Sequence, residues 1–297
     1  MTLRWTKLSP QIALTPALIV TLVAFIGSIF WTIYLSFTRS RRVPEYGIDW
    51  SDWLRQYERL FQDAGWAISL KNLVVLGIGS TLAIAFGFVL AAMIDRERRG
   101  ESFFRTVFLY PLAVSLIVTG VAWRWILNPD LGLENFLHGL GFTGVSFNWL
   151  ADPQTAMYAI ILASIWQSSG FYMALMISGL KGINGEIWSA ARLDGVGVWR
   201  LYVEIIIPMM KFTFLTCAIL LSLGVIKAYD IVVAMTNGGP GQSTWVPAYF
   251  TINALTQKQN LGYASAAAVM MLLITAAIFL PLAGLMAWQQ RAKGAAK

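Results

Sequence analysis

The sequence has one cysteine, one histidine and few charged side chains. Because Cys217 is alone, the chain can form neither a disulfide scaffold nor a CxxC metal or redox site, and the single His138 excludes a metal site built from several histidines. Charged residues are 12% of the 297 residues, against roughly a quarter in an ordinary soluble domain. The sequence also contains no GxxxxGK[ST] motif for binding nucleotide phosphates. We therefore expect neither a water-soluble fold nor a cofactor bound by this chain.

Long apolar runs account for the 57% of hydrophobic residues. There are six of them: 12–37, 73–94, 106–127, 155–180, 212–235 and 261–288. At about 1.5 Å rise per residue, each run is long enough as a helix to cross a hydrocarbon core of about 30 Å. The sequence thus predicts an all-α membrane protein with six transmembrane helices.

The basic residues indicate which loops face the cytoplasm. With six spans, thirteen Lys and Arg fall on the side of segments 1–11, 95–105, 181–211 and 289–297, and seven fall on the other side. The richer side is expected to be cytoplasmic, so both termini are expected there. The run 12–37 is too long for a signal-peptide core and is expected to remain as a helix. For a membrane protein, a net charge of +7 indicates topology rather than nucleic-acid binding.

The three external segments differ in composition. Segment 38–72 combines arginines with aromatic residues and is expected to form an amphipathic segment at the outer membrane interface. Its aromatic residues include Trp50, Trp53, Tyr57, Phe61 and Trp66. Segments 128–154 and 236–260 are rich in Gly, Pro and Asn, so we expect irregular surface structure there.

Segment 181–211, between the fourth and fifth runs, has the signals of a short capped helix. Asn184 or Gly185 can begin it, with Glu186 in the first turn, where a negative charge interacts favourably with the helix dipole. Gly195 can end it in the left-handed conformation. The residues expected to share one face are Ile187, Ala190, Ala191 and Asp194. A second amphipathic run follows and is closed by Pro208. A simple interfacial hairpin is the alternative interpretation.

This segment resembles the signature loop of the permease subunits of bacterial binding-protein-dependent ABC importers, which has the form Glu-Ala-Ala, three residues, Gly. Ala190, Ala191 and Gly195 match that pattern, Asp194 precedes the glycine as in many members, and Ser189 replaces the glutamate. Four further stretches are similar to the carbohydrate-uptake subgroup of maltose-type permeases. They are Tyr57-Glu-Arg-Leu-Phe61, Phe103-Phe-Arg-Thr-Val-Phe-Leu-Tyr-Pro111, Thr236-Asn-Gly-Gly-Pro240 and Gly262-Tyr-Ala-Ser265.

The resemblance implies a complete transport system. It implies a second six-span permease, as a heterodimer, two cytoplasmic ATPase subunits that bind ATP and Mg, an external solute-binding protein and a carbohydrate substrate, in the bacterial inner membrane. Segment 181–211 would then be the cytoplasmic coupling-helix loop between spans 4 and 5, docking on the ATPase. The docking residues would be Glu186, Ser189, Ala190, Ala191, Asp194 and Gly195. The chain itself would not be an enzyme.

Polar side chains within the runs are candidates for the substrate path, because they are costly in lipid. In the fifth run these are Lys227, Tyr229 and Asp230, and in the fourth Trp166, Gln167 and Tyr172. Lys227 and Asp230 are expected on one helical face within ion-pair reach, so a self-satisfied pair or a snorkelling lysine is the alternative. Aromatic faces with an amide suit sugar binding, whereas the nearby serines suit helix packing.

Other functions are less consistent with the sequence. An ion-gradient-driven secondary transporter is the main alternative, but the sequence has no internal repeat and only Asp230 as an acid within the runs. An ABC importer permease for a non-sugar solute is a second alternative. A structural membrane subunit would not explain the capped helix, and an intramembrane enzyme lacks any acid, base or ligand constellation.

Overall fold

The computed structural model describes residues 5–96, 100–144 and 146–294. Within these residues the chain is helical and has no strand beyond an isolated bridge between Thr38 and Ile48. The predicted all-α class is confirmed. Of the basic residues used to assign the topology, Arg4, Arg98, Arg99 and Lys297 lie outside the described residues.

Four helical stretches of the described residues are long and apolar enough to cross a membrane: Leu14–Ser36, Ala64–Asp95, Ala156–Lys181 and Leu261–Pro281. Two further pairs of helices pass the same test together, but each is bent, by 96° in the first pair and by 70° in the second. If each bent pair is one span, the number of spans rises to six.

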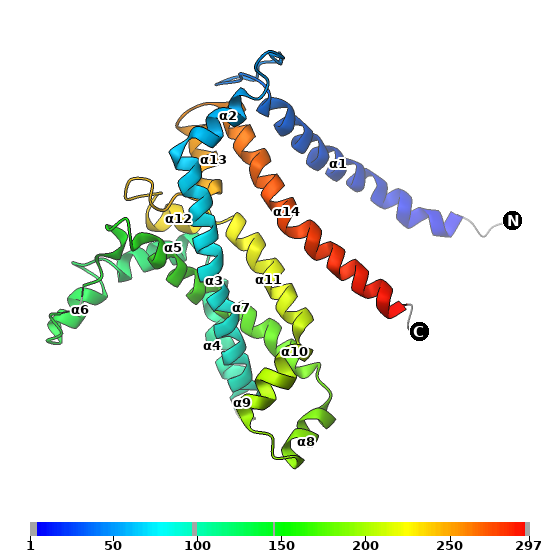
Figure 1. Ribbon diagram of the computed structural model, residues 1–297, viewed down its shortest axis with the longest axis vertical. Coiled ribbons are helices and arrows are strands. Elements are labelled where there is room, and N and C mark those ends of the chain that lie inside the picture. Colours follow the sequence, from blue (N-terminus) through cyan, green and yellow to red (C-terminus); the bar gives the residue numbers. More distant parts are fainter. Residues whose placement is uncertain (1–4, 97–99, 145, 295–297) are drawn as a thin grey trace. The chain divides into compact units, whose positions relative to one another are not determined.

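The chain divides into two compact units. The first contains 1–66 and 250–274, and the second 67–249 and 275–297. In the first unit lie α1 (Trp5–Ser36) and α2 (Arg55–Gln62), while α3 (Ala64–Arg96), α13 (Pro247–Thr256) and α14 (Leu261–Gly294) have residues in both (Figure 1).

The first unit contains α2, an amphipathic helix within the segment 38–72. Leu60 is fully buried on its inner face, and the Gln56 side chain donates from Nε2 to the carbonyl oxygen of Thr38 over 2.9 Å. Trp50 is exposed, as an interfacial residue would be, but Trp66 is a core residue instead, packed edge-on against Phe250. The aromatic content of 38–72 thus serves both the surface and the core.

The helix expected over 106–127 is two helices, α4 (Glu101–Ala113) and α5 (Leu116–Ile126). Pro111 lies in the last turn of α4, and the Ser115 hydroxyl accepts a hydrogen bond from the Val118 N–H, which caps the start of α5. A proline followed by an N-cap serine ends one helix and begins another, so the single-helix prediction was wrong.

The helix expected over 212–235 is also broken, into α11 (Lys211–Ile226) and α12 (Asp230–Met235). The chain leaves the helical path at Lys227, and Asp230 lies in the first turn of α12, where its charge is favourable. α12 packs closely on α5, since a Cβ added to Gly120 would lie 2.5 Å from the Ala234 Cβ. The chain therefore packs α12 against α5 instead of continuing the helix α11.

The fourth run behaves as predicted, as α7 (Ala156–Lys181). It carries much of the core of the second unit, with Met173 and Met176 fully buried. Two glycines allow close packing, because a Cβ on Gly87 would lie 2.8 Å from the Met173 nitrogen and one on Gly170 would lie against the Phe108 backbone.

The two segments expected to be irregular contain helices. Segment 128–154 has α6 (Leu133–Gly139) and the 3₁₀ turn η1 (Asn148–Leu150), and 236–260 has α13. α13 forms because Phe250 and Ala254, one turn apart, are both buried. Glycine and proline content therefore misled the prediction, since these residues lie largely around the helices.

Candidate functional site

The capped helix predicted in 181–211 is α8 (Gly185–Leu193), which projects beyond α7 and α11 (Figure 1). The Asn184 side chain accepts a hydrogen bond from the Glu186 N–H over 3.1 Å, so the predicted N-cap is confirmed. Gly195 has φ of +65°, as predicted. The Val196 N–H donates to the Ala191 oxygen and the Gly195 N–H to the Arg192 oxygen, the paired bonds of a Schellman motif. Both ends of α8 are thus fixed.

The predicted docking residues are mostly on the outside of α8. Glu186, Ser189, Ala190, Asp194 and Gly195 are exposed, whereas Ala191 is buried against the core. The predicted shared face is therefore wrong in part, because Ala191 faces inward and Ala190 outward.

Two large exposed apolar side chains, one at the end of α8 and one just after it, were missed by the sequence analysis. Leu193 is 88% exposed and Trp199 is 81% exposed. The sequence could have indicated both, because each is a large apolar residue that lies outside the helix faces predicted to be apolar. Such side chains in a capped, projecting hairpin make a surface suited to a partner.

A row of aromatic rings connects α8 to the long helices. Trp188 of α8 meets Tyr202 edge-on at 6.0 Å between ring centroids, and Tyr202 meets Phe88 of α3 at 6.1 Å. Phe88 in turn meets Phe214 of α11 at 5.4 Å. Tyr202 belongs to η2 (Leu201–Ile206), a π-helical turn between α9 (Val198–Arg200) and α10 (Ile207–Met209). The bend before α11 is at Met210, two residues after Pro208.

A cavity of about 130 Å³ lies between α3, α7 and the break after α11. Its polar lining comes mainly from α7, with Ser164, Gln167, Ser168 and Tyr172. The hydroxyls of Ser164 and Ser168 each donate to a backbone oxygen one turn earlier, whereas the Gln167 amide bonds to no described residue. Gln167 is therefore the cavity-lining group most able to bind a polar solute.

The other predicted path residues do not line this cavity. Trp166 packs edge-on against Trp123, and Tyr229 stacks on Tyr249. Lys227 and Asp230 lie on either side of the helix break, and both are exposed. No ion pair joins them within the part of the chain that the structure describes, so the expectation of a shared helical face was wrong.

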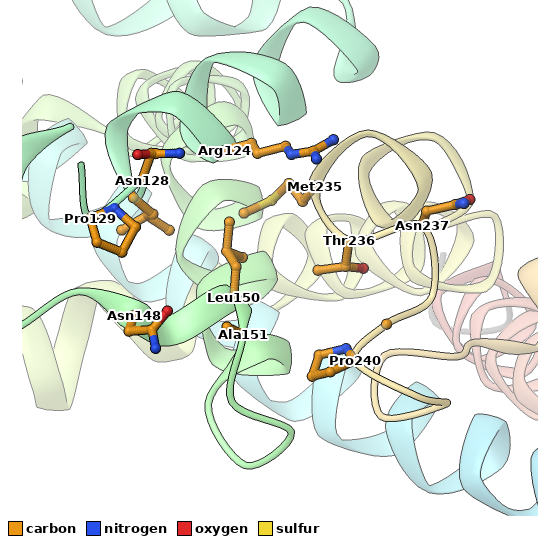
Figure 2. A pocket seen from close by; sticks show the side chains of 12 residues that line it. Arg124, Asn128, Pro129, Asn148, Leu150, Ala151, Met235, Thr236, Asn237 and Pro240 are labelled. Carbon is orange, nitrogen blue, oxygen red and sulfur yellow. The ribbon is translucent and has the colours of Figure 1, made fainter. Parts of the chain in front are cut away.

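A second pocket, of about 490 Å³, lies between the end of α5, the turn η1 and the end of α12. Figure 2 shows Leu150 and Met235 at its centre, with Asn128 on one side and Thr236 and Asn237 on the other. Arg124 also lines this pocket. The motif 236–240 therefore forms one wall of a polar opening at the end of the bent helices.

The remaining expectations concern single residues. Cys217 is a buried side chain in α11. His138 lies in α6 and not in an irregular loop. Within the described part of the chain no three His, Cys, Asp or Glu residues gather into a possible metal site.

Known proteins resemble this chain over nearly its whole length. A probable ABC transporter permease protein of Pyrococcus horikoshii is 36% identical over 90% of this chain and 92% of its own. The diacetylchitobiose uptake system permease protein of Streptomyces coelicolor is 32% identical over 86% of this chain and 75% of its own. A solved structure of a bacterial ABC transporter that imports the acidic polysaccharide alginate has a TM-score of 0.79 and 18% identity, and the match covers 95% of this chain and 97% of that one.

The family model described as "binding-protein-dependent transport system inner membrane component" matches residues 83–294, which include α8 and both bent pairs. The match supports the resemblance seen in the short motifs. This chain therefore belongs to that family and is a permease component of an ABC importer in the inner membrane.

Proposed function

We propose that this chain is one of two permease subunits that carry a sugar from a solute-binding protein into the cytoplasm by alternating access, driven by ATP hydrolysis on partner subunits. The observation that supports this most directly is α8, capped at both ends, exposed, and connected to α3 and α11 by ring contacts. A rigid helix tethered in this way transmits a movement that a flexible loop would absorb.

In this proposal α8 docks on an ATPase subunit. Glu186, Ser189, Ala190 and Asp194 lie on its exposed side, with Gly195 at its end and Leu193 beside it. Ala191 supports the helix from inside and would not touch the partner directly. ATP and Mg would be bound by the ATPase subunits, and this chain would bind no cofactor.

The proposed assembly contains a second six-span permease, as a heterodimer, two ATPase subunits and an external solute-binding protein. The six spans would be α1, α3, the pair α4–α5, α7, the pair formed by α9–α10 and α11, and α14. Both termini and α8 would face the cytoplasm, because the loops on that side carry more Lys and Arg.

We propose a carbohydrate as the substrate. The 32% identical relative is a diacetylchitobiose uptake permease, and Gln167 and Tyr172 offer an amide and an aromatic side chain in one cavity. Four predicted path residues are sequence neighbours of cavity-lining residues: Trp166, Lys227, Tyr229 and Asp230. We propose that they contact the sugar in other states of the transport cycle.

Reconstitution tests this function. The chain, its partner permease and the ATPase subunits encoded with it are placed in proteoliposomes, and uptake of radiolabelled sugars is measured with the binding protein outside and ATP inside. We expect uptake only when all components and ATP are present. Uptake by this chain alone, driven by a proton or sodium gradient, would show a secondary transporter instead.

A further inference from the structure

A pocket of about 470 Å³ lies in the first unit, between α2 and the start of α14, and the proposed transport cycle does not use it. It is lined by Arg41, Arg59, Gln62, Asp63, Lys258, Asn260 and Tyr263. Two of the motifs that resemble sugar permeases, 57–61 and 262–265, each contribute a residue to it.

The floor of the pocket is fixed by hydrogen bonds to one carboxylate. Asp63 Oδ2 accepts a hydrogen bond from the Tyr263 hydroxyl over 2.7 Å and another from Lys258 Nζ over 3.0 Å. Its other oxygen, Oδ1, accepts one from the Gly65 N–H over 2.8 Å. All of these groups lie in the first unit. The carboxylate neutralises the charge of Lys258, and the three hydrogen bonds hold it in one position.

Two positive charges at the pocket remain uncompensated. Arg59 lies over the Tyr263 ring, 5.5 Å from its centroid, and Arg41 is held through its backbone oxygen, which accepts from the Leu261 N–H over 3.1 Å. Neither guanidinium makes an ion pair with any residue in the described ranges. With Lys258 neutralised by Asp63, the pocket has a net charge of about +2 and suits an anion with several oxygens.

The position of the pocket indicates the kind of anion. Gln62 and Asp63 come immediately before the candidate span Ala64–Asp95, and Asn260 immediately before Leu261–Pro281. The pocket thus lies where two apolar helices begin, and it would be near the lipid headgroups if both helices cross the membrane. On and beside α2, Phe61 is 61% exposed and Trp53 is 45% exposed, as aromatic residues at a membrane interface are.

We propose that this pocket binds the phosphate group of an anionic phospholipid, with Arg41 and Arg59 as the charged ligands and the Lys258–Asp63–Tyr263 cluster as the support that places them. The exposed aromatic side chains would lie against the acyl chains next to the bound headgroup. The proposal depends on the insertion of α3 and α14 in a membrane and not on transport.

The test compares lipid binding by the purified chain and by an Arg41→Gln/Arg59→Gln variant. Native mass spectrometry and thermal unfolding in detergent are recorded with phosphatidylglycerol, phosphatidylcholine, diacylglycerol and inorganic phosphate. We expect phosphatidylglycerol to stabilise the wild type most, and the double variant to bind it at least about tenfold more weakly. Arg55→Gln is the matched control, since Arg55 is on the same helix but lies near Asp52 and outside the pocket, and its lipid binding should be unchanged.

Three outcomes would overturn the proposal. The first is equal phosphatidylglycerol binding by the wild type and the double variant. The second is full stabilisation by inorganic phosphate with no further effect of lipid, which would show a site for a soluble anion. The third is unchanged lipid binding with weaker association of the solute-binding protein, which would show a docking surface. The first two outcomes leave the proposed sugar uptake unaffected, because uptake is measured separately in proteoliposomes.

Discussion

Gly170 of α7 lies directly against the backbone of Phe108 in α4. A Cβ at position 170 would clash with the Phe108 carbonyl oxygen, and a backbone oxygen cannot turn aside as a flexible side chain can. We expect Gly170→Ala to separate α4 from α7 and to lower the free energy of unfolding by about 1–3 kcal/mol or more. Thermal unfolding in detergent checks this, with Gly27→Ala as control because a Cβ there meets no atom within 4 Å. Equal melting temperatures for both variants would contradict the close contact.

Replacing Gly195 should uncouple transport from ATP hydrolysis. Gly195 has φ of +65°, and a β-branched residue there costs about 1–2 kcal/mol, which is enough to disturb the end of α8. We expect Gly195→Val to insert normally but to lose most sugar uptake in proteoliposomes. Gly185→Ala is the control, because position 185 has no positive φ and open space around it. Wild-type uptake and ATPase coupling in Gly195→Val would argue against docking by α8.

Tyr202 is expected to matter for coupling through its ring. It is the only ring in the row from Trp188 to Phe214 that contacts both α8 and α3. Tyr202→Ala should leave ATP hydrolysis by the assembled complex intact but reduce uptake per ATP hydrolysed. Tyr202→Phe keeps the ring and should retain coupling. If both variants lost coupling equally, the hydroxyl rather than the ring contacts would be responsible.

Gln167 should contribute to the affinity for the transported sugar. One hydrogen bond between uncharged groups is worth about 0.5–1.5 kcal/mol, so Gln167→Leu should raise the half-saturating sugar concentration up to about tenfold. Thr216→Val is the control, since Thr216 bonds to its own helix and does not line the cavity. Concentration-dependent uptake in proteoliposomes measures both. An unchanged half-saturating concentration in Gln167→Leu would place the sugar elsewhere.

The first unit should lose stability at acid pH, because the ionised form of Asp63 stabilises it. Burial raises the pKa of Asp63, but hydrogen bonds from Tyr263, Lys258 and the Gly65 N–H and the positive charge of Lys258 together lower it more, so its pKa in the folded protein lies below the ordinary value of 3.8. A depressed pKa stabilises the fold above the unfolded-state value, and that stability is lost as the pH falls through the folded-state value. We expect the melting temperature of the wild type to drop below about pH 4. Asp63→Asn should melt lower at pH 7 and show a smaller drop; an equal drop would assign the acid sensitivity to other carboxylates.

The sequence predicted those features that depend on local signals. The Asn184 cap, the left-handed Gly195 and the bounds of α7 all follow from neighbouring residues, and the structure confirms them. Hydropathy alone could not locate the two breaks, because each lies within a longer stretch that is apolar on both sides of it. Pro111 and Ser115 were available as signals for the first break, whereas the second, at Lys227, depends on the packing of α12 against α5.

The candidate site residues show the same division between local and long-range signals. Gln167 and Tyr172 do line one cavity, because both belong to an unbroken helix whose faces can be counted from the sequence. The predicted ion pair between Lys227 and Asp230 required one continuous helix, but α11 ends and α12 begins between these residues. Arg124 joins a pocket with Asn148 and Asn237, which are distant in sequence and meet only through the folded chain.

The contact between Gly120 and Ala234 has a mechanical consequence. It binds two short helices, α5 and α12, to each other, while each is joined to its own long helix only by a few non-helical residues, 114–115 for one and 227–229 for the other. We therefore expect α5 and α12 to move as one body, so that a displacement of α11 would also reach α4.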